Sequence, residues 1–245
     1  MWDNITWIKK VFLGIDIILA DEKGHYIQAF IKKDALTYYR DKLKEGQMYI
    51  IKNFEVTKNK PTYRCVSNNL MINFIFATSL QPLDDDDPNV PQQVFDLVSY
   101  DTIKLRADKD IQLIDLIGRL KKLGKLETIN GRKGKVLRRV IEVEIKSGDI
   151  ITINLWSEVA KSLDDHLPSN KSTTMVLILT SLTTKTFNGN ITLGSTDQTR
   201  IFSDIRLPEI TDYIKGRHNK TLVLHFLPTG KLSEETNTRR REVKM

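Results

Sequence analysis

The 245-residue sequence has one cysteine, Cys65, so it offers neither a disulfide framework nor a zinc site made of several cysteines. Its apolar runs are too short to cross a membrane, and a long one, residues 11–20, is interrupted by Asp16. No signal segment is expected at the start of this sequence, because Asp3 and Asn4 are followed by a lysine pair rather than an apolar run. These absences predict a protein of a reducing compartment with no membrane partner.

Sequence motifs for catalysis are also missing. The chain has no G-x-x-x-x-G-K-[ST] phosphate loop, no H-E-x-x-H and no C-x-x-C. The histidines have no partner at the spacing of a metal site or a catalytic triad; they are His25, His166, His218 and His225. Carboxylates are plentiful, but no two form a recognisable acid–base couple. The sequence therefore predicts no enzyme, no cofactor and no metal site.

Positive charge is the first feature that the chain does have. It carries 38 Lys and Arg against 31 Asp and Glu, a net charge of +7 that permits an anionic partner. Residues 119–139 contain nine basic residues and one acidic residue, Glu127, so this segment alone carries nine minus one, or +8. A solvated lysine-rich loop would explain it. A glycine-punctuated basic loop beside an aromatic strand would also suit a groove for a single nucleic-acid strand.

A strand that ends at an aromatic residue and runs into a short helix occurs twice, at residues 26–43 and 151–163. Because successive strand side chains point to opposite faces, Phe30 and Trp156 lie on the polar face of their strands. A covering loop would explain either ring alone. Two such rings favour display to a flat ligand, since stacking contributes roughly 1–3 kcal/mol per base.

The chain is predicted to be all-β, with two five-stranded units. Strands are expected over residues 11–20, 26–32, 47–57, 62–67 and 71–79, and over 113–120, 136–146, 150–156, 174–186 and 190–203. Helices are expected over residues 34–43, 158–165 and 208–216. Five strands with a helix between the third and fourth are typical of the OB-fold, a small Greek-key barrel. Allowing for a first strand in the first unit, the repeat fits two tandem OB-fold barrels.

Four segments follow from this interpretation. Residues 1–80 form a first OB-fold that is truncated at its N-terminus, and residues 81–103 form an acidic, proline-containing linker. Residues 104–218 form a second OB-fold with a C-terminal helix, and residues 219–245 form a partly disordered tail. The aspartate run of the linker is interpreted as a solvated spacer rather than a cation site.

From about residue 11 to residue 218 the sequence resembles the two central DNA-binding domains of the large, 70 kDa subunit of replication protein A, above all its shortened plant-type paralogues. The second unit shows the resemblance in DLIGRL, INLW and TTKTFNGNITLGSTDQTRIFSDI. The first unit shows it in LADEKGHYIQAFIKK and TYRCVSNNLMINFIFATSLQP, and the segment between them in VPQQVFDLVSYDTI.

The resemblance implies non-catalytic binding of single-stranded DNA in replication, repair or recombination, and a nuclear location. The family stacks bases on two aromatics per domain, which implies Phe30 and Tyr63 in the first unit and Trp156 and Phe187 in the second. Tyr63 shares a face with Cys65 and could equally be a packing residue. The resemblance implies phosphate contacts from nearby basic residues, namely Lys32, Lys33, Arg64, Lys133, Lys135, Arg138, Arg139 and Lys185.

The sequence departs from the family pattern in two places. The first unit has few residues before its second strand, so residues 1–10 supply either a stub of the first strand or none, which would leave an open edge. A third DNA-binding domain and the assembly helix are missing, which argues against the usual heterotrimer. Two alternatives therefore stand beside DNA binding: a degenerate OB-fold paralogue that binds proteins, and an RNA- or telomere-binding variant.

Overall fold

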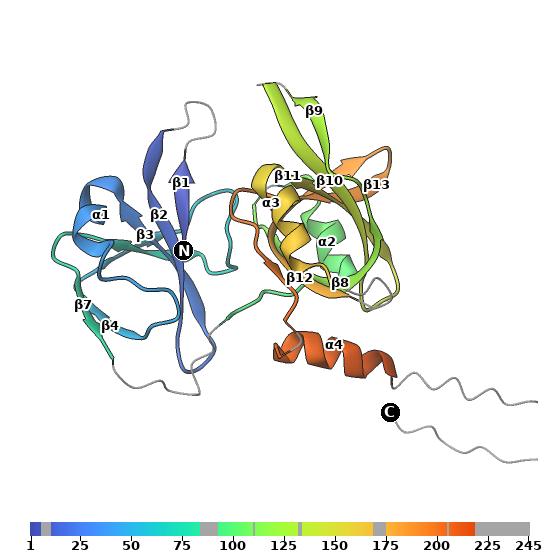
Figure 1. Cartoon of the computed structure of the whole chain (residues 1–245). Helices are drawn as coiled ribbons and strands as arrows, with labels where there is room; N and C mark the ends of the chain where they lie inside the picture. The colour runs from blue at the N-terminus through green and yellow to red at the C-terminus, as the bar shows by residue number, and fades with distance from the viewer. Residues whose placement is uncertain are drawn as a thin grey trace, which may run out of the picture.

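The structure is a computed structural model that describes residues 1–5, 11–83, 93–109, 111–131, 134–168, 175–204 and 206–218. Lys133, part of the expected linker (84–92) and the expected tail (219–245) lie outside these ranges. Two β-rich units lie side by side, which confirms the prediction of an all-β chain with two tandem OB-folds (Figure 1). Within the described residues, no helix is long and apolar enough to span a membrane.

The first unit contains a five-stranded sheet in the order β1-β2-β3-β6-β5, in which β3 and β6 run parallel. Its elements are β1 (Trp2–Ile5), β2 (Phe12–Ala20), β3 (Tyr26–Lys32), α1 (Lys33–Tyr39), β4 (Tyr49–Lys52), β5 (Glu55–Lys58), β6 (Leu70–Phe74) and β7 (Ser79–Pro82). The first residues thus supply a strand, β1, that pairs with β2. Among the described strands no pairing joins β1 to β5, so the ring stays open there.

Two of the strands expected in the first unit are broken, and one is absent. Asn53 has a φ of 59°, which ends β4 and starts a new strand, β5. The second break, between β6 and β7, is tied to the first by Thr78, whose hydroxyl donates to the Asn53 carbonyl (2.9 Å) and accepts from the Ile75 N–H (3.0 Å). The strand expected over 62–67 is wrong, because this segment belongs to a loop, residues 59–69, in which Arg64 forms one isolated bridge.

The second unit is a closed barrel. Its strands are β8 (Ile114–Leu123), β9 (Glu127–Gly131), β10 (Gly134–Glu144), β11 (Ile150–Trp156), β12 (Val176–Phe187), β13 (Asn190–Gly194) and β14 (Ile201–Phe202). The ring runs β8-β10-β11-β13-β12 and returns to β8, with β11 and β13 parallel. A helix and a 3-10 turn, α3 (Ser157–Ser162) and η1 (Leu163–His166), follow β11 as expected. Gly118 allows β8 to approach β10, because a Cβ there would lie 2.4 Å from a methyl of Val143.

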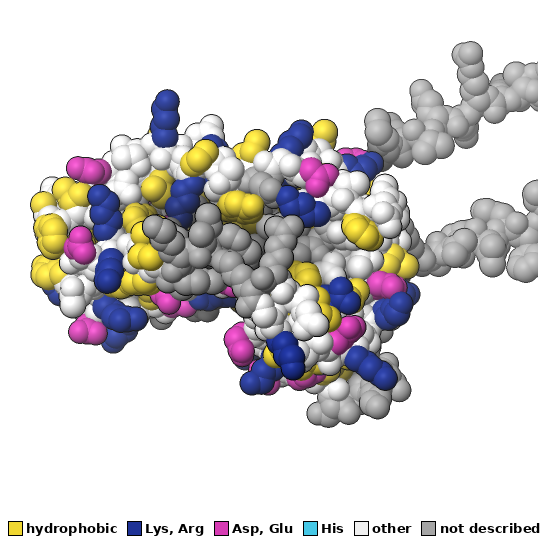
Figure 2. Space-filling model, turned by 90° about the horizontal axis from the view of Figure 1, so that it is seen from above, with side chains coloured by type: hydrophobic (Ala, Val, Ile, Leu, Met, Phe, Trp, Pro, Cys, Tyr) yellow, Lys and Arg dark blue, Asp and Glu magenta, His cyan; other side chains and the backbone are white. Residues whose placement is uncertain are grey.

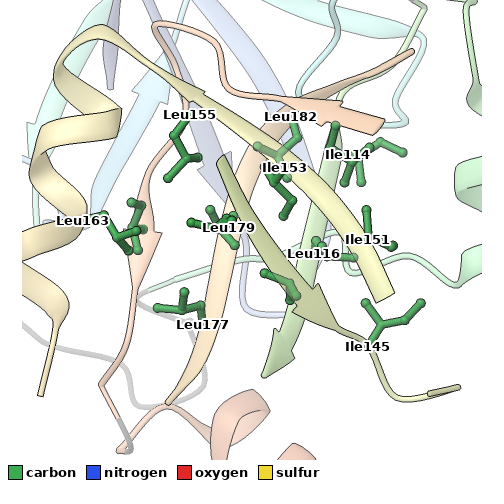
Figure 3. Packing of buried hydrophobic residues seen from close by; sticks show 14 of the residues in the cluster. Ile114, Leu116, Ile145, Ile151, Ile153, Leu155, Leu163, Leu177, Leu179 and Leu182 are labelled. Carbon is green, nitrogen blue, oxygen red and sulfur yellow. The ribbon is translucent and has the colours of Figure 1, made fainter. Parts of the chain in front are cut away.

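The core of this barrel confirms the alternation predicted for β11. Ile151, Ile153 and Leu155 point inward and are fully buried with Leu116 and Leu179 (Figure 3). Burying each such side chain contributes about 1.5–3 kcal/mol relative to exposing it. Because these three positions are fixed inside, Thr152, Asn154 and Trp156 must lie on the outer face.

The second unit differs from the prediction in its basic segment and in one additional helix, and it also shows where the expected C-terminal helix packs. The basic segment 119–139, predicted as a loop, is a β-hairpin in which β9 and the start of β10 form an arm that rises beyond the barrel (Figure 1). Helix α2 (Tyr100–Arg106) was not predicted; it starts at Ser99, whose hydroxyl accepts from the Thr102 N–H (3.3 Å), and it buries Ile103 in the core. Helix α4 (Pro208–His218), which was expected, packs on the outside of β12 and β8.

The loop 59–69 of the first unit reaches the second unit. The Arg64 N–H donates to the Ile111 carbonyl (3.0 Å), and the Leu113 N–H donates to the Arg64 carbonyl (2.8 Å). Next to this bridge Cys65 is buried, and its Sγ lies 3.0 Å from Gln198 Oε1 and 3.8 Å from Ser181 Oγ. The two barrels are therefore joined by backbone and side-chain contacts as well as by the chain between them.

The single thiol reports on this contact. Burial raises the pKa of the Cys65 thiol to about 12, so at pH 8 only about one molecule in ten thousand carries the reactive thiolate. We expect labelling of the native protein by a disulfide reagent at pH 8 to be at least about a hundredfold slower than labelling of the urea-unfolded chain. Rapid, stoichiometric labelling of the native protein would show that the loop 59–69 does not stay against the second barrel.

Candidate nucleic-acid interface

Trp156 stands at the corner between β11 and α3. Its backbone N–H donates to Ser195 Oγ (2.8 Å), and the next residue, Ser157, has a φ of 51°, which turns the chain sharply into the helix. The indole lies alongside Gly194, where an added Cβ would be 3.6 Å from the indole nitrogen. Gly194 places no side chain beside the ring, which is half-buried.

The strand register brings Phe187 to the same face as Trp156. Residues opposite each other in neighbouring strands share a face, and Arg138 is opposite Trp156, while Lys185 and Phe187 are opposite Thr192 and Asn190. Phe187 is 67% exposed and precedes the tight Asn188-Gly189 turn, in which both residues have positive φ. This face, called here the Trp156 face, consists of Arg138, Asn154, Trp156, Thr183, Lys185, Phe187, Thr192 and Gly194.

Of the three predicted basic residues of the segment 119–139 that the structure describes, Arg138 alone has its side chain on this face. Lys135 is exposed, but alternation along β10 places it on the opposite face of the arm. Arg139 also points that way, and it is 6% exposed and bound to Asp164 by two hydrogen bonds of 2.6 and 3.0 Å. The Arg139 guanidinium thus holds the 3-10 turn against β10. Lys185 is exposed on the Trp156 face.

Much of the basic charge of residues 119–139 is matched by acidic residues from outside that segment. The pairing of β8 with β10 places Glu142 and Glu144 beside it: Lys122 donates to Glu142 (2.9 Å), and Arg119 donates to Glu144 (3.0 Å). Lys121 is 3.5 Å from Glu144. Accordingly, the coloured basic and acidic side chains are interspersed when the molecule is seen from above (Figure 2). The positive field is weaker than the sequence segment alone predicts.

In the first barrel Phe30 is half-buried on the outer face of β3, but its surroundings differ from those of Trp156. The residue opposite Phe30 on β2 is Asp16, which is fully buried and accepts hydrogen bonds from Gln28 (3.0 Å) and from Lys60 (2.6 and 2.7 Å). The Lys60 ammonium lies 5.7 Å from the centre of the Phe30 ring. The loop 59–69 therefore lies over this face and contributes its own cation to it.

The other predicted residues of the first barrel surround that loop. Tyr63 is 46% exposed in the loop, with a φ of 55°. Arg64 is held within the loop, because its guanidinium donates to the Lys60 carbonyl (2.5 Å) and to Asn69 Oδ1 (2.6 Å). Lys32 and Lys33 are exposed where β3 passes into α1.

Two residues of the candidate site were not among those predicted from the sequence. Asn154 lies on the Trp156 face, two residues before the indole, and alternation along β11 was sufficient to find it. Lys60 is brought to Phe30 by a turn of the loop, and no local pattern indicates that contact. Within the residues that the structure describes, no three His, Cys, Asp or Glu side chains are grouped as a metal site.

Comparisons with known proteins agree with this architecture. A family model described as domain of unknown function DUF223 matches residues 2–105. The chain is 21% identical over 196 residues to one of the replication protein A 70 kDa DNA-binding subunits of Arabidopsis thaliana, covering 79% of this chain and 31% of that protein. It is 26% identical over 168 residues to replication factor A protein 1 of Saccharomyces cerevisiae, covering 68% and 26%. The chain thus spans about a third or less of the length of these curated relatives.

Among solved structures, the chain is similar to a replication protein A heterotrimer bound to single-stranded DNA. The TM-score is 0.55 at 19% sequence identity, and the match covers 89% of this chain and 49% of the other. At this identity the likeness shows the fold.

The pair between Arg139 and Asp164 predicts a stability effect. We expect Asp164→Asn to lower the free energy of unfolding by about 1–2 kcal/mol at neutral pH, because the buried guanidinium loses a charged acceptor that is itself half exposed. The matched control is Asp165→Asn, an exposed neighbour. Urea unfolding measures both, and equal stability of the two variants would contradict the role given to Asp164.

The same pair predicts a pH dependence. The hydrogen bonds from Arg139 hold the pKa of Asp164 below its ordinary value. A carboxyl whose pKa is lowered in the folded state stabilises the fold at pH values above its unfolded-state pKa of about 3.9. This stabilisation is lost as the pH falls through the lowered pKa of the folded state. The stability difference between wild type and Asp164→Asn should therefore shrink only in acid.

Proposed function

The chain is homologous over about four fifths of its length to 70 kDa subunits of replication protein A, and from this homology and the Trp156 face we propose that it binds single-stranded DNA without catalysing a reaction. The observation that carries the proposal is the placement of two accessible rings, Trp156 and Phe187, on one polar face of a closed barrel. Flat rings with polar surroundings bind bases of any sequence by stacking.

In the proposed complex a single strand crosses β11, β13 and β12 on the outside of the barrel. One base stacks on Trp156 and another on Phe187. Phe187 pairs with Asn190, which the parallel register places level with Ile150, so the two rings are six residues apart along the strands and two strands apart, roughly 20–25 Å. Arg138 and Lys185, which lie on the same face, contact the backbone phosphates. Asn154 lies between the rings and is positioned to donate to a base edge.

The second barrel supplies most of the affinity in this proposal. Around Phe30, the loop 59–69 covers part of the face, and the buried Asp16 carboxylate already binds the nearby Lys60. Tyr63, Lys32 and Lys33 remain accessible for weaker contacts with the strand. Because the two barrels are held together, a strand bound to the second meets the first at a high effective concentration.

By the same homology we place the protein in the nucleus, in DNA replication, repair or recombination. Two observations would favour other functions. Failure to bind any single strand at about 50 mM salt, where electrostatic attraction is strong, would favour a protein-interaction module. Stronger competition by RNA or by G-rich DNA than by oligo-dT would favour an RNA- or telomere-binding protein.

The stacking role is tested by removing the rings. We expect Trp156→Ala and Phe187→Ala each to weaken binding of a fluorescent oligo-dT by roughly five- to 150-fold, the range that corresponds to one stacked base. Tyr38→Ala is the matched control, since Tyr38 is an exposed aromatic on α1, away from the Trp156 face. Fluorescence anisotropy at low salt measures all three. A double variant of Trp156 and Phe187 with wild-type affinity would rule out the mechanism.

The inequality of the two barrels gives a second test. We expect Phe30→Ala to weaken the same binding by less than about threefold, because the ring is half-buried beside the loop and stacking there is incomplete. The measurement is the same titration, with thermal unfolding as a check that the first barrel still folds. A loss equal to or larger than that of Trp156→Ala would place the main site in the first barrel instead.

A further inference from the structure

Arg138 occupies the middle of a row of three side chains on the Trp156 face. On one side its cross-strand partner is Trp156 of β11, and on the other it is Glu127 of β9. Directly opposed residues in antiparallel strands point to the same face, so a carboxylate, a guanidinium and an indole lie in line across the base of the arm. Glu127 is the only acidic residue of the segment 119–139.

The contact between Arg138 and Glu127 is loose. Nη2 of Arg138 is 3.5 Å from Oε2 of Glu127, beyond the roughly 2.7–2.9 Å of a charge-assisted hydrogen bond. The Nε of Arg138 is buried and has no acceptor among the described residues. The neighbouring Arg139 shows the contrast, because its two hydrogen bonds to Asp164 are 2.6 and 3.0 Å long. The guanidinium of Arg138, whose side chain is 32% exposed, therefore has no closely bound acceptor in the part of the chain that the structure describes and can bind a better-placed anion through its Nη2.

We propose that Glu127 holds, in the unbound protein, the place beside Arg138 that a backbone phosphate takes when the adjoining base stacks on Trp156. This role of Glu127 rests on the proposed function, because it assigns to the glutamate an effect that weakens DNA binding. Carboxylate and phosphate compete for the same guanidinium, so binding requires Glu127 to turn toward solvent, to which its side chain is already 47% exposed. Glu127 thus lowers the affinity of the site and reduces the positive charge that the strand meets.

Glu142 provides a matched control for this competition. It lies on the same face of β10 as Arg138, four residues further along, so its removal changes the net charge of that face equally. Its partner, however, is Lys122, at 2.9 Å on β8, rather than Arg138. A purely long-range charge effect would act through both glutamates, whereas competition for Arg138 acts through Glu127 alone.

The experiment compares Glu127→Gln, Glu142→Gln, Arg138→Gln and the Glu127→Gln/Arg138→Gln double variant in oligo-dT titrations across salt. We expect Glu127→Gln to raise affinity about two- to fivefold at low salt, the range of one exposed ion pair. It should also steepen the plot of log affinity against log salt by up to about 0.7, the value of one more neutralised phosphate on a single strand. In the Arg138→Gln background the same change should have little effect, which a double-mutant cycle measures directly.

The outcomes separate the two proposals. A wild-type chain that binds no oligomer overturns both the proposed function and the role of Glu127. Wild-type binding with an unchanged Glu127→Gln variant, or equal gains from Glu127→Gln and Glu142→Gln, overturns only the role of Glu127. An undiminished gain in the Arg138→Gln background does the same, because it shows that the glutamate acts without the arginine. Circular dichroism confirms that each variant is folded.

Discussion

The parallel pairing of β11 with β13 closes the ring of the second barrel, and the rest of the proposed interface depends on it. Closure removes the exposed edges of the sheet and commits Ile151, Ile153 and Leu155 to the interior. Since the side chains of a strand alternate, every polar position of β11 is then forced outward. The same pairing brings β12 to the far side of β13, so that Phe187 reaches the face of Trp156 although the two are 31 positions apart in sequence.

The sequence was sufficient to predict the structure wherever a local pattern determines the position of a side chain or a turn. Alternation placed Trp156 outside and its neighbours inside, and the Asn188-Gly189 pair located the hairpin that displays Phe187. Local patterns did not predict contacts that depend on the pairing of strands far apart in the sequence. The acidic partners of the basic segment come from Glu142 and Glu144, which only the β8–β10 pairing brings near. The breaks at Asn53 and Thr78 are likewise stabilised by contacts across the sheet rather than by residue type alone.

The two copies of the strand, aromatic and helix pattern show how one motif acquires two environments. Trp156 has a glycine beside it and an arginine opposite, whereas Phe30 has a buried carboxylate opposite and a lysine from a loop close to its ring. A buried carboxylate must be paired, and Lys60 and Gln28 supply its partners. Lys60 of the loop 59–69 thus stabilises the first barrel by pairing with Asp16, and less of the polar surface of the loop is free to bind a ligand.

The backbone bridge between Arg64 and the 111–113 segment has a thermodynamic consequence for any long ligand. Two barrels on a free tether must lose rotational and translational freedom when one strand binds across both, and that loss weakens binding. Here the loss of freedom occurs when the protein folds, because Arg64 and Cys65 are already seated against the second barrel. In the proposed complex, the relative orientation of the two candidate faces is therefore set before a strand arrives.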